Sequence, residues 1–471
     1  MTRPTAYFLL TFFMTALFFA QPAAAESLVL NMKRTVTFTP ADAAKPPVVT
    51  EETITFYPDF ISVRFGTAER IYNFAAKTLV VFDHAAKTYM VHPLHAVPMF
   101  YDAERTSRLA LKIKMNNAVR EAGGDAVDKV TLEDIDLDMA FSTNANTRTA
   151  YLMDKRKEDG KTVFFPKQKD PLDLAAYKTR EGTLAPAFKK AYKRYLAYET
   201  AIHPVIEDAL LKESNIFAAL EYNNRDVLRK TNAQTVLELK SSSVSADNAP
   251  TMPEGYTMKL SSDPAINALM ERGLKTPMPD MNALKEQIGK LIEEEQYAHA
   301  FMVAAEVPLM LTGAETQKYH ESVLKAGFLS AEGFDQQIYF AVTRSPANEA
   351  DLAKFLNVMD SYKDKVGDKG YLLDYFKAQH IRKVIFAKLD HTEEDKVLLK
   401  QAYDYIITAL ENNPRLVNPF FDLGGTEYQN NRMTEAFLFW DHAARLAPAH
   451  ESIYAIRKMK LDTEKKFPEF F

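Results

Sequence analysis

Three histidines near an aspartate are the first candidates in this sequence for a metal-binding site. His84, His92 and His95 lie close together, and Asp83 precedes the first of them. A metal site needs three or four ligands that converge at about 2 Å. The spacing has no helical or zinc-finger context, and Pro93 indicates a strand that ends in a loop. We therefore interpret these histidines as surface residues and predict no metal site.

The acidic segment 133–138 is a second candidate, because its acidic side chains alternate with apolar ones. A calcium-binding loop would need glycine where Met139 stands and glutamate where Ala145 stands. Ile135 and Leu137 instead predict an amphipathic strand whose acidic face meets water.

Motifs for enzymatic nucleophiles, dinucleotide loops, phosphate loops and zinc proteases do not occur in the sequence. The chain has no cysteine, which excludes thiol catalysis and cysteine-bound iron–sulfur clusters. We predict a protein that is not an enzyme and has no cofactor. An enzyme is the alternative, and it would have a polar pocket with shifted pKa values at the junction of its domains.

Composition and charge narrow the class of partner. The 471 residues are 47% hydrophobic, which is typical of globular proteins and excludes a mostly disordered chain. Lys and Arg number 58 against 63 Asp and Glu, so the net charge is −5. Such a balance does not favour binding to a phosphate backbone, and we predict no nucleic-acid partner.

Residues 1–25 have the pattern of a secretory signal peptide. Arg3 is followed by an apolar run over residues 6–20 and by a small-residue exit that ends at Ala25. The run is shorter than the roughly 20 apolar residues of a membrane-spanning helix. We predict cleavage near Ala25, a periplasmic or secreted location, and a mature chain that is not an integral membrane protein.

Short apolar runs separated by turns dominate residues 26–245. In the first run, the even positions from Leu28 to Phe38 are apolar, and Arg34 is the exception. Closely spaced runs of this kind predict an antiparallel sheet. Helical insertions are predicted over 186–211, where Pro204 starts a second helix or kinks the first, and over 106–122, where a strand is the alternative.

The strand pattern of residues 54–94 (ITFYPDFISVRFGTAERIYNFAAKTLVVFDHAAKTYMVHPL) resembles the periplasmic lipoprotein-carrier family. The resemblance implies an open, concave half-barrel with helices that plug its hollow side. Such a sheet could hold an acyl chain or a protein segment.

Prolines and serines mark residues 246–282 as a linker, and the pattern beyond it is helical. Within residues 283–471, small and large residues recur at a displacement of 34 residues: Ala402, Ile406, Ala409 and Pro414 return as Ala436, Trp440, Ala443 and Pro448. Together with Phe420, Leu423 and Gly424, residues 418–448 resemble one tetratricopeptide repeat. The family's tyrosine falls on Glu427, with Tyr428 next to it.

The resemblance implies a helical solenoid with a groove for a protein segment. The clearest repeats span about 371–414 and 415–448, and residues 452–466 are predicted to cap the stack. The repeat residues Ala402, Ile406, Ala409, Pro414, Leu423, Gly424, Ala436, Ala443 and Pro448 are assigned structural roles. Groove residues that could bind the partner are Phe420, Tyr428, Phe437 and Trp440, although spacing alone does not separate groove from core.

The sequence therefore predicts an α+β protein with a curved antiparallel sheet followed by a tetratricopeptide-like solenoid. The predicted function is a non-enzymatic, protein-binding scaffold in cell-envelope biogenesis. The alternative is a carrier or sensor that holds a lipid or acyl chain in the sheet. The chain ends on Phe467-Pro468-Glu469-Phe470-Phe471, a segment that we predict to dock into a groove of this chain or of a partner.

Overall fold

The computed structural model describes residues 26–39, 46–121, 152–167, 173–180, 184–200, 202–213, 216–226, 231–245, 250–311, 336–388 and 391–471. Two compact units make up the chain. The sheet unit comprises the chain up to Lys259 together with Lys460–Phe471, and the helical unit comprises Leu260–Met459. The division falls within the segment that the sequence assigns to the linker, and the last residues belong with the sheet.

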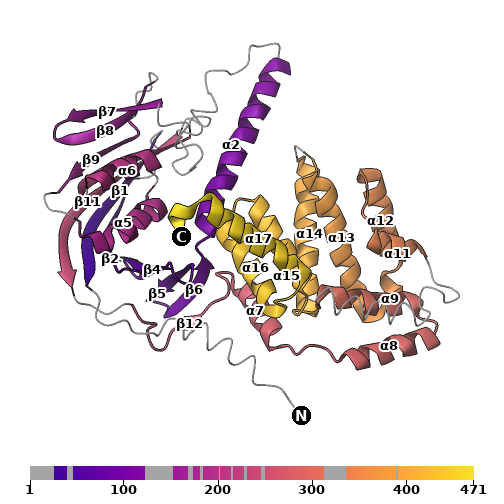
Figure 1. The fold of residues 1–471 in the computed structure, drawn as a ribbon. Coiled ribbons are helices and arrows are strands. Elements are labelled where there is room, and N and C mark those ends of the chain that lie inside the picture. Colours follow the sequence, from indigo (N-terminus) through magenta and orange to yellow (C-terminus); the bar gives the residue numbers. More distant parts are fainter. Residues whose placement is uncertain are drawn as a thin grey trace. The chain divides into compact units, whose positions relative to one another are not determined.

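An open, curved sheet forms the first unit (Figure 1). Its twelve strands, counted over the described residues, have the order β12-β6-β5-β4-β3-β2-β1-β11-β10-β9-β8-β7. Neighbours pair antiparallel except β12 and β6, which pair in parallel. The strands are β1 (Ser27–Thr39), β2 (Val48–Phe56), β3 (Phe60–Phe65), β4 (Ala68–Asn73), β5 (Thr78–Asp83), β6 (Thr88–Pro93), β7 (Met153–Glu158), β8 (Lys161–Pro166), β9 (Ala175–Thr179), β10 (Phe217–Asp226), β11 (Thr231–Ser245) and β12 (Thr257–Met258).

Tight turns join β3 to β4 and β7 to β8. Gly66 and Gly160 have positive φ angles, and Asp159 before Gly160 also lies in the left-handed region. An Asp-Gly pair with both residues at positive φ matches the right-handed twist of the two strands that it joins, here β7 and β8.

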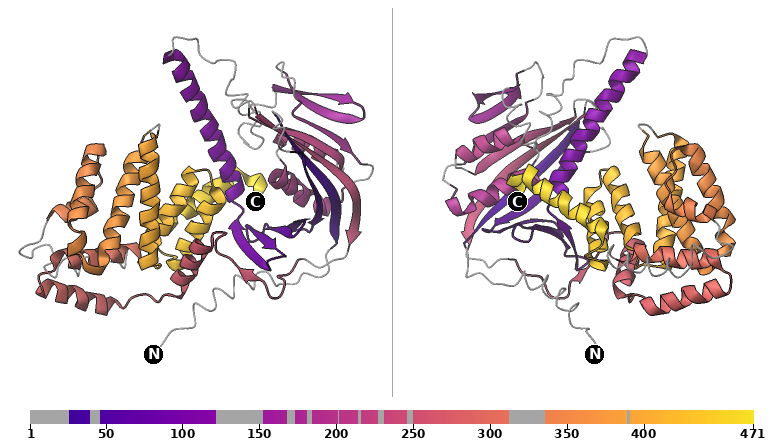
Figure 2. Two further views of the ribbon diagram at one scale, coloured as in Figure 1. Left: turned by 180° about the vertical axis from the view of Figure 1, so that it is seen from behind. Right: turned by 45° about the vertical axis from the view of Figure 1, so that its right-hand side comes forward.

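Helices α5 (Pro186–Glu199) and α6 (Pro204–Lys212) lie inside the curve of the sheet (Figure 2). Each begins with its proline, whose missing N–H costs nothing in the first turn, so Pro204 starts a second helix. The buried face of α5 is rich in tyrosine, and Tyr192 and Tyr195 pack edge-on against Phe56 of β2 at 5.7 and 5.6 Å. The region around 106–122 belongs to helix α2 (Ala96–Glu121) and is not a strand.

The C-terminal tail, residues 460–471, completes the core of the sheet unit. Phe467 and Phe470 are buried in the same apolar cluster as the α5 tyrosines. The hydroxyl of Tyr198 donates a hydrogen bond of 3.0 Å to the carbonyl oxygen of Phe470. The predicted docking of the tail therefore occurs in the tail's own chain.

The helical unit is built from helices that contact their chain neighbours in pairs: α8 with α9, α11 with α12, α13 with α14, and α15 with α16 (Figure 1). The sequence prediction of an α+β protein, with an antiparallel sheet followed by helices, is confirmed. The helices are α7 (Pro264–Lys275), α8 (Met281–Glu293), α9 (Tyr297–Glu306), α11 (Gln336–Thr343), α12 (Glu349–Ser361), α13 (Gly370–Phe386), α14 (Glu393–Asn412), α15 (Val417–Gln429), α16 (Met433–Leu446) and α17 (Glu451–Lys466). Short 3₁₀ turns are η2 (Val307–Leu309), η4 (Lys363–Lys365), η5 (Gly367–Lys369) and, in the tail, η6 (Pro468–Phe470).

Two sequence predictions, the signal peptide over 1–25 and the acidic strand over 133–138, lie outside the described residues.

Candidate functional site

Charged residues interrupt the apolar face of three strands in the sheet unit. On β1, Arg34 is two and four positions away from the buried Met32 and Leu30 and so shares their face of the strand. In the same way, Glu52 on β2 shares the face of Ile54, and Arg70 on β4 shares the face of Tyr72. Because side chains alternate between the two faces of a strand, these charges point to the side that carries the core.

Arg34 and Glu52 form a bidentate ion pair. The Nε of Arg34 donates to Oε1 of Glu52 at 2.6 Å, and Nη2 donates to Oε2 at 3.1 Å. The remaining Nη1 donates to the backbone oxygen of Glu199 at 3.2 Å and to the hydroxyl of Tyr222 at 3.3 Å. The Glu52 side chain is only 3% exposed, so this pairing compensates the loss of its hydration.

Glu199, the last residue of α5, joins the second arginine to this network. Arg70 Nη2 donates to Oε2 of Glu199 at 2.9 Å, and the hydroxyl of Tyr72 donates to Oε1. Burial raises the pKa of Glu199, while Arg70, the Tyr72 hydrogen bond and Arg34 act in the opposite direction. The Nε of Arg70 is buried and has no hydrogen-bond partner among the described residues.

These charged groups line a cavity of about 500 Å³, which we call the ligand pocket. Its other walls are aromatic or carry hydroxyl and amide groups, among them Phe65, Tyr101, Tyr198, Tyr222, Asn224 and Thr235. The pocket holds two guanidinium groups and two carboxyl groups, so its formal charges balance. It offers hydrogen-bond donors and acceptors beside aromatic rings and is of the size of a small-molecule site.

The interpretation of the three flagged histidines as surface residues is wrong for His92 and His95, which are buried in the sheet unit. The partners of His84 and His95 are separate. His84 lies 2.7 Å from the Tyr256 hydroxyl and 2.8 Å from Glu69, and His95 lies 2.8 Å from Glu464. Within the described ranges, no group of three or more histidine, aspartate or glutamate side chains is placed to hold a metal ion.

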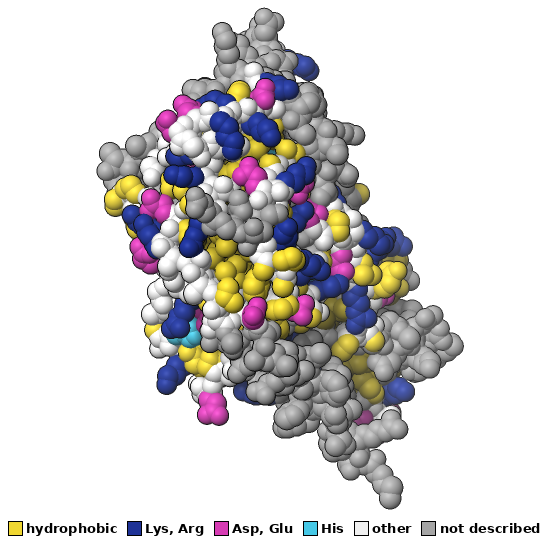
Figure 3. Space-filling model, turned by 60° about the vertical axis from the view of Figure 1, so that its left-hand side comes forward, with side chains coloured by type: hydrophobic (Ala, Val, Ile, Leu, Met, Phe, Trp, Pro, Cys, Tyr) yellow, Lys and Arg dark blue, Asp and Glu magenta, His cyan; other side chains and the backbone are white. Residues whose placement is uncertain are grey.

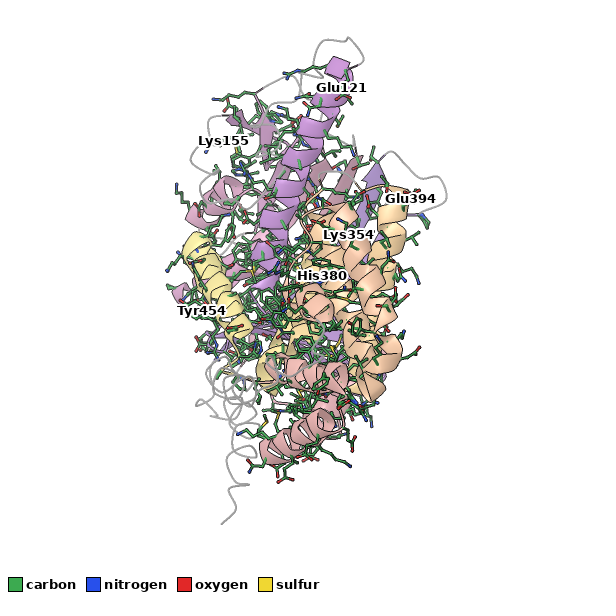
Figure 4. All side chains as sticks on the ribbon, turned by 90° about the vertical axis from the view of Figure 1, so that its right-hand side faces the viewer. Glu121, Lys155, Lys354, His380, Glu394 and Tyr454 are labelled. Carbon is green, nitrogen blue, oxygen red and sulfur yellow. The ribbon has the colours of Figure 1, made fainter. Side chains whose placement is uncertain are left out.

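Another histidine, His380 on α13, sits among the helices of the helical unit (Figure 4). Its ring bonds the Ala341 carbonyl oxygen at 2.6 Å, which gives it a packing role.

Three of the four predicted groove residues are buried in the helical unit. Phe420, Phe437 and Trp440 lie in the core, and Tyr428 is half-buried with its ring 5.8 Å from that of Trp440. Phe420, Phe437 and Trp440 therefore pack between helices, and only Tyr428 keeps part of its surface exposed. Partner binding by these residues stays a prediction.

The predicted repeat residues lie mainly where helices pack closely. Most of them are buried: Ala402, Ile406, Ala409, Pro414, Leu423, Gly424, Ala436 and Ala443. A side chain at Gly424 would collide with the indole of Trp440, which explains the need for a small residue there. Pro448 is exposed and follows the end of α16.

Surface charge of both signs is visible on the face shown in Figure 3, where lysine and arginine side chains are interspersed with acidic ones. In the part of the chain that the structure describes, no helix has both the length and the apolar character needed to cross a membrane.

Comparison with known proteins gives little guidance. No protein-family model and no curated protein sequence matches the chain. One solved structure to which it is similar, described as "Lipid-protein interactions in lipovitellin", is 10% identical with a TM-score of 0.16. The match covers 89% of this chain and 56% of the lipovitellin chain, so this chain spans about half of that protein's length. A likeness of this strength carries no argument about fold or ligand.

Proposed function

We propose that this protein is a non-enzymatic binding protein of the cell envelope, whose sheet unit holds a small, neutral, polyhydroxylated ligand of the sugar class. The observation that carries the proposal is the charge-balanced ligand pocket of about 500 Å³ around Arg34 and Arg70. The export pattern of residues 1–25 supports an envelope location.

The lining of the pocket favours a ligand with many hydroxyl groups. Guanidinium and carboxyl groups offer donors and acceptors in fixed directions, and Phe65 and Tyr222 offer ring faces and edges for the apolar side of a sugar ring. An acyl chain placed beside the same walls would exclude water from four charged groups and add no hydrogen bond to those that they make with one another. The polar walls therefore favour a sugar over the lipid that the sequence resemblance implied.

The charged groups themselves support binding over catalysis. Glu52 is held by two bonds from Arg34, and Glu199 is held by Arg70 and Tyr72. Carboxyl groups held in this way position their partners and the walls of the pocket. The polar pocket that the enzyme alternative required lies inside the sheet unit, and turnover of a bound sugar would be its signature.

The helical unit remains proposed as the part that engages a protein segment. The displacement of 34 residues between the two clearest repeats supports a tetratricopeptide-like arrangement of α13 to α16. In this view the protein is an adaptor that joins a small ligand to a protein partner.

Isothermal titration calorimetry of the chain without residues 1–25 tests the proposal with maltose, N-acetylglucosamine and palmitate as probes. We expect one of the sugars to bind. Asn224→Ala, which removes an exposed amide from the pocket wall, should weaken sugar binding about three- to tenfold, the effect of one hydrogen bond. Asn31→Ala is the matched control, because Asn31 lies on the same sheet outside the pocket.

Binding of palmitate alone, or equal loss of affinity in both variants, would refute the sugar proposal. Mass spectrometry of the probes after incubation distinguishes a binding protein from an enzyme, since a binding protein leaves their masses unchanged.

A further inference from the structure

The C-terminal tail packs against residues that line the ligand pocket. We call this bound position of the tail its seated state. Phe470 is fully buried, with its ring 5.0 Å from that of Tyr198 and 6.4 Å from that of Tyr101. Tyr198 and Tyr101 both line the ligand pocket as well. Among the described residues, the tail itself does not line the pocket, but its removal would take away the support behind two side chains that do.

Ion pairs at the start of the tail anchor it to the sheet unit. Glu464 lies 2.5 Å from Nζ of Lys77 and 2.8 Å from Nε2 of His95. Lys466 lies 2.5 Å from the carboxylate of Asp102 on α2. These contacts precede the aromatic residues, so they tether the tail without depending on how the aromatic residues are seated.

Two carboxyl groups lie next to the buried Phe470, and their ionisation would destabilise the docked tail. Glu207 of α6 and Glu469 of the tail line one small void of about 10 Å³, together with Phe470. Glu207 is only 3% exposed, and the Oε1 atoms of both carboxyl groups have no hydrogen-bond partner within the described residues. Two ionised carboxylates that line one void repel each other, and protonation of either group relieves the repulsion.

The surroundings offer this pair little compensation. Lys193 of α5 is the cation that faces both carboxyl groups, and its Nζ already pairs with Asp208 at 3.1 Å. Asp208 itself adds negative charge near the pair.

We propose that the C-terminal tail is a proton-controlled gate of the ligand pocket, seated while the Glu207–Glu469 pair holds a proton and released when both groups are ionised. As a gate it rests on the proposed function, because it regulates access to the same pocket.

The direction of the pH effect follows from burial. Burial raises the pKa of Glu207 to about 8 and also raises the pKa of Glu469. Release of the tail exposes both groups to water, so their pKa values fall toward the ordinary 4.5 and seating takes up a proton. Seating is therefore strongest at acidic pH and weakens as the pH rises to about 8, by about tenfold per pH unit for each proton taken up.

The other titratable groups along the tail respond in a different range. Burial lowers the pKa of His95 from 6.5, so titration of this ring makes seating stronger as the pH rises, which is opposite to the effect of the carboxyl pair. The pKa of Glu464 is lowered by Lys77 and His95 against the effect of burial, so this group is ionised above pH 6.5. A weakening of seating between pH 6.5 and 8.5 therefore points to the carboxyl pair, because neither His95 nor Glu464 produces a change in that direction.

A nitroxide label at the end of the full chain tests the gate. The chain has no cysteine, so a cysteine appended after Phe471 is a unique attachment point. Electron paramagnetic resonance should show an immobile label at pH 6.5. The ratio of mobile to immobile label should rise at least tenfold by pH 8.5.

Variants assign the change to the carboxyl pair. Glu469→Gln together with Glu207→Gln should keep the label immobile up to pH 8.5, whereas Glu469→Gln alone, which leaves Glu207 buried, should only reduce the rise. Glu238→Gln, an exposed site on β11, should behave like the unmodified chain. An unchanged spectrum between pH 6.5 and 8.5 would overturn the gate, and so would the same rise in the double variant.

Maltose titrations at the same pH values separate this inference from the proposed function. A label that moves with pH while no sugar binds refutes the proposed function and leaves the proton-controlled tail. A sugar that binds while the label stays immobile at every pH overturns the gate alone.

Discussion

Arg34 connects four groups through one guanidinium: the carboxylate of Glu52, the hydroxyl of Tyr222, and the backbone oxygen and carboxylate of Glu199. The guanidinium is tolerated in this position because these hydrogen bonds and ion pairs replace the hydration that it loses. Removing only one member of the Arg34–Glu52 pair should therefore destabilise the fold more than replacing both members with apolar residues.

Arg34→Met should therefore lower the free energy of unfolding by about 3–5 kcal/mol, because Glu52 is left buried without its counter-charge. Urea unfolding followed by circular dichroism measures this loss. The double variant Arg34→Met/Glu52→Leu should recover most of it. A single variant that loses under 1 kcal/mol would show that Glu52 finds water or another partner.

His442 on α16 is a second residue whose environment fixes its protonation. It is 1% exposed, neither ring nitrogen has a hydrogen-bond partner among the described residues, and the ring packs 4.4 Å from that of Phe420. Burial lowers the pKa of His442 to about 3, with smaller contributions from Arg445 and Arg415.

His442→Leu should therefore flatten the acid side of the stability profile. Between pH 6.5 and about 3 the unfolded chain binds a proton at this histidine and the folded chain does not, so stability falls by about 1.4 kcal/mol per pH unit. Relative to its own value at pH 7, the variant should lose about 2 kcal/mol less than the unmodified chain at pH 5. Urea unfolding of both proteins at pH 7 and pH 5 measures these losses. Equal losses of unfolding free energy in the two proteins would contradict the prediction.

At the scale of elements, α5 shows how one helix serves both core and site. Tyr192 and Tyr195 pack on Phe56 of β2, and Glu199 at the end of the helix reaches the arginines of the sheet. The two tyrosines differ in one respect. The Tyr192 hydroxyl accepts a hydrogen bond of 3.3 Å from the Phe217 backbone, whereas the buried Tyr195 hydroxyl has no partner among the described residues.

Phenylalanine substitutions at these two positions should have opposite signs. Tyr195→Phe removes a buried hydroxyl that makes no bond and should raise the free energy of unfolding by about 1 kcal/mol. Tyr192→Phe leaves the Phe217 N–H without an acceptor and should lower it by about 1 kcal/mol. Chemical denaturation of both variants side by side is the measurement. Equal effects would indicate that the two hydroxyl groups share one environment.

At the scale of the whole molecule, the two ends of the sheet unit's sequence lie on either side of the helical unit's sequence. A variant that deletes residues 283–471 would remove the tail together with the helices. An experiment on the sheet unit must therefore delete 260–459 and keep 460–471.

Phe470→Ala tests this dependence on the end of the chain. The substitution empties a fully buried aromatic position in the sheet unit and should cost about 3–5 kcal/mol of stability. The β-sheet signal in circular dichroism should show the loss, while fluorescence of Trp440, the single tryptophan, reports on the helical unit. Tyr454→Ala on α17, at a position 73% exposed, is the control and should change stability by less than about 0.5 kcal/mol. A Phe470→Ala chain as stable as this control would mean that the tail contributes little to the core.

Much of the fold follows from local patterns in the sequence. The alternation in β1, the turns from β3 to β6, and the prolines that begin α5 and α6 are readable because each depends on neighbouring residues alone. The strands β9 and β10 were not predicted, and neither was the pairing of β1 with β11 across more than 180 residues. Such pairing depends on which distant segments share a buried face, and local spacing carries no record of it.

The candidate site divides in the same way. Arg34 was visible as a charge in an apolar alternation, and Glu52 and Arg70 carry the same signal on their strands. What the sequence determined by itself was that charged side chains point toward a core. That two arginines and two glutamates meet around one cavity was decided only by the tertiary structure, because the pairing and curvature of the sheet bring together residues of β1, β2, β4 and α5 that lie far apart in the sequence.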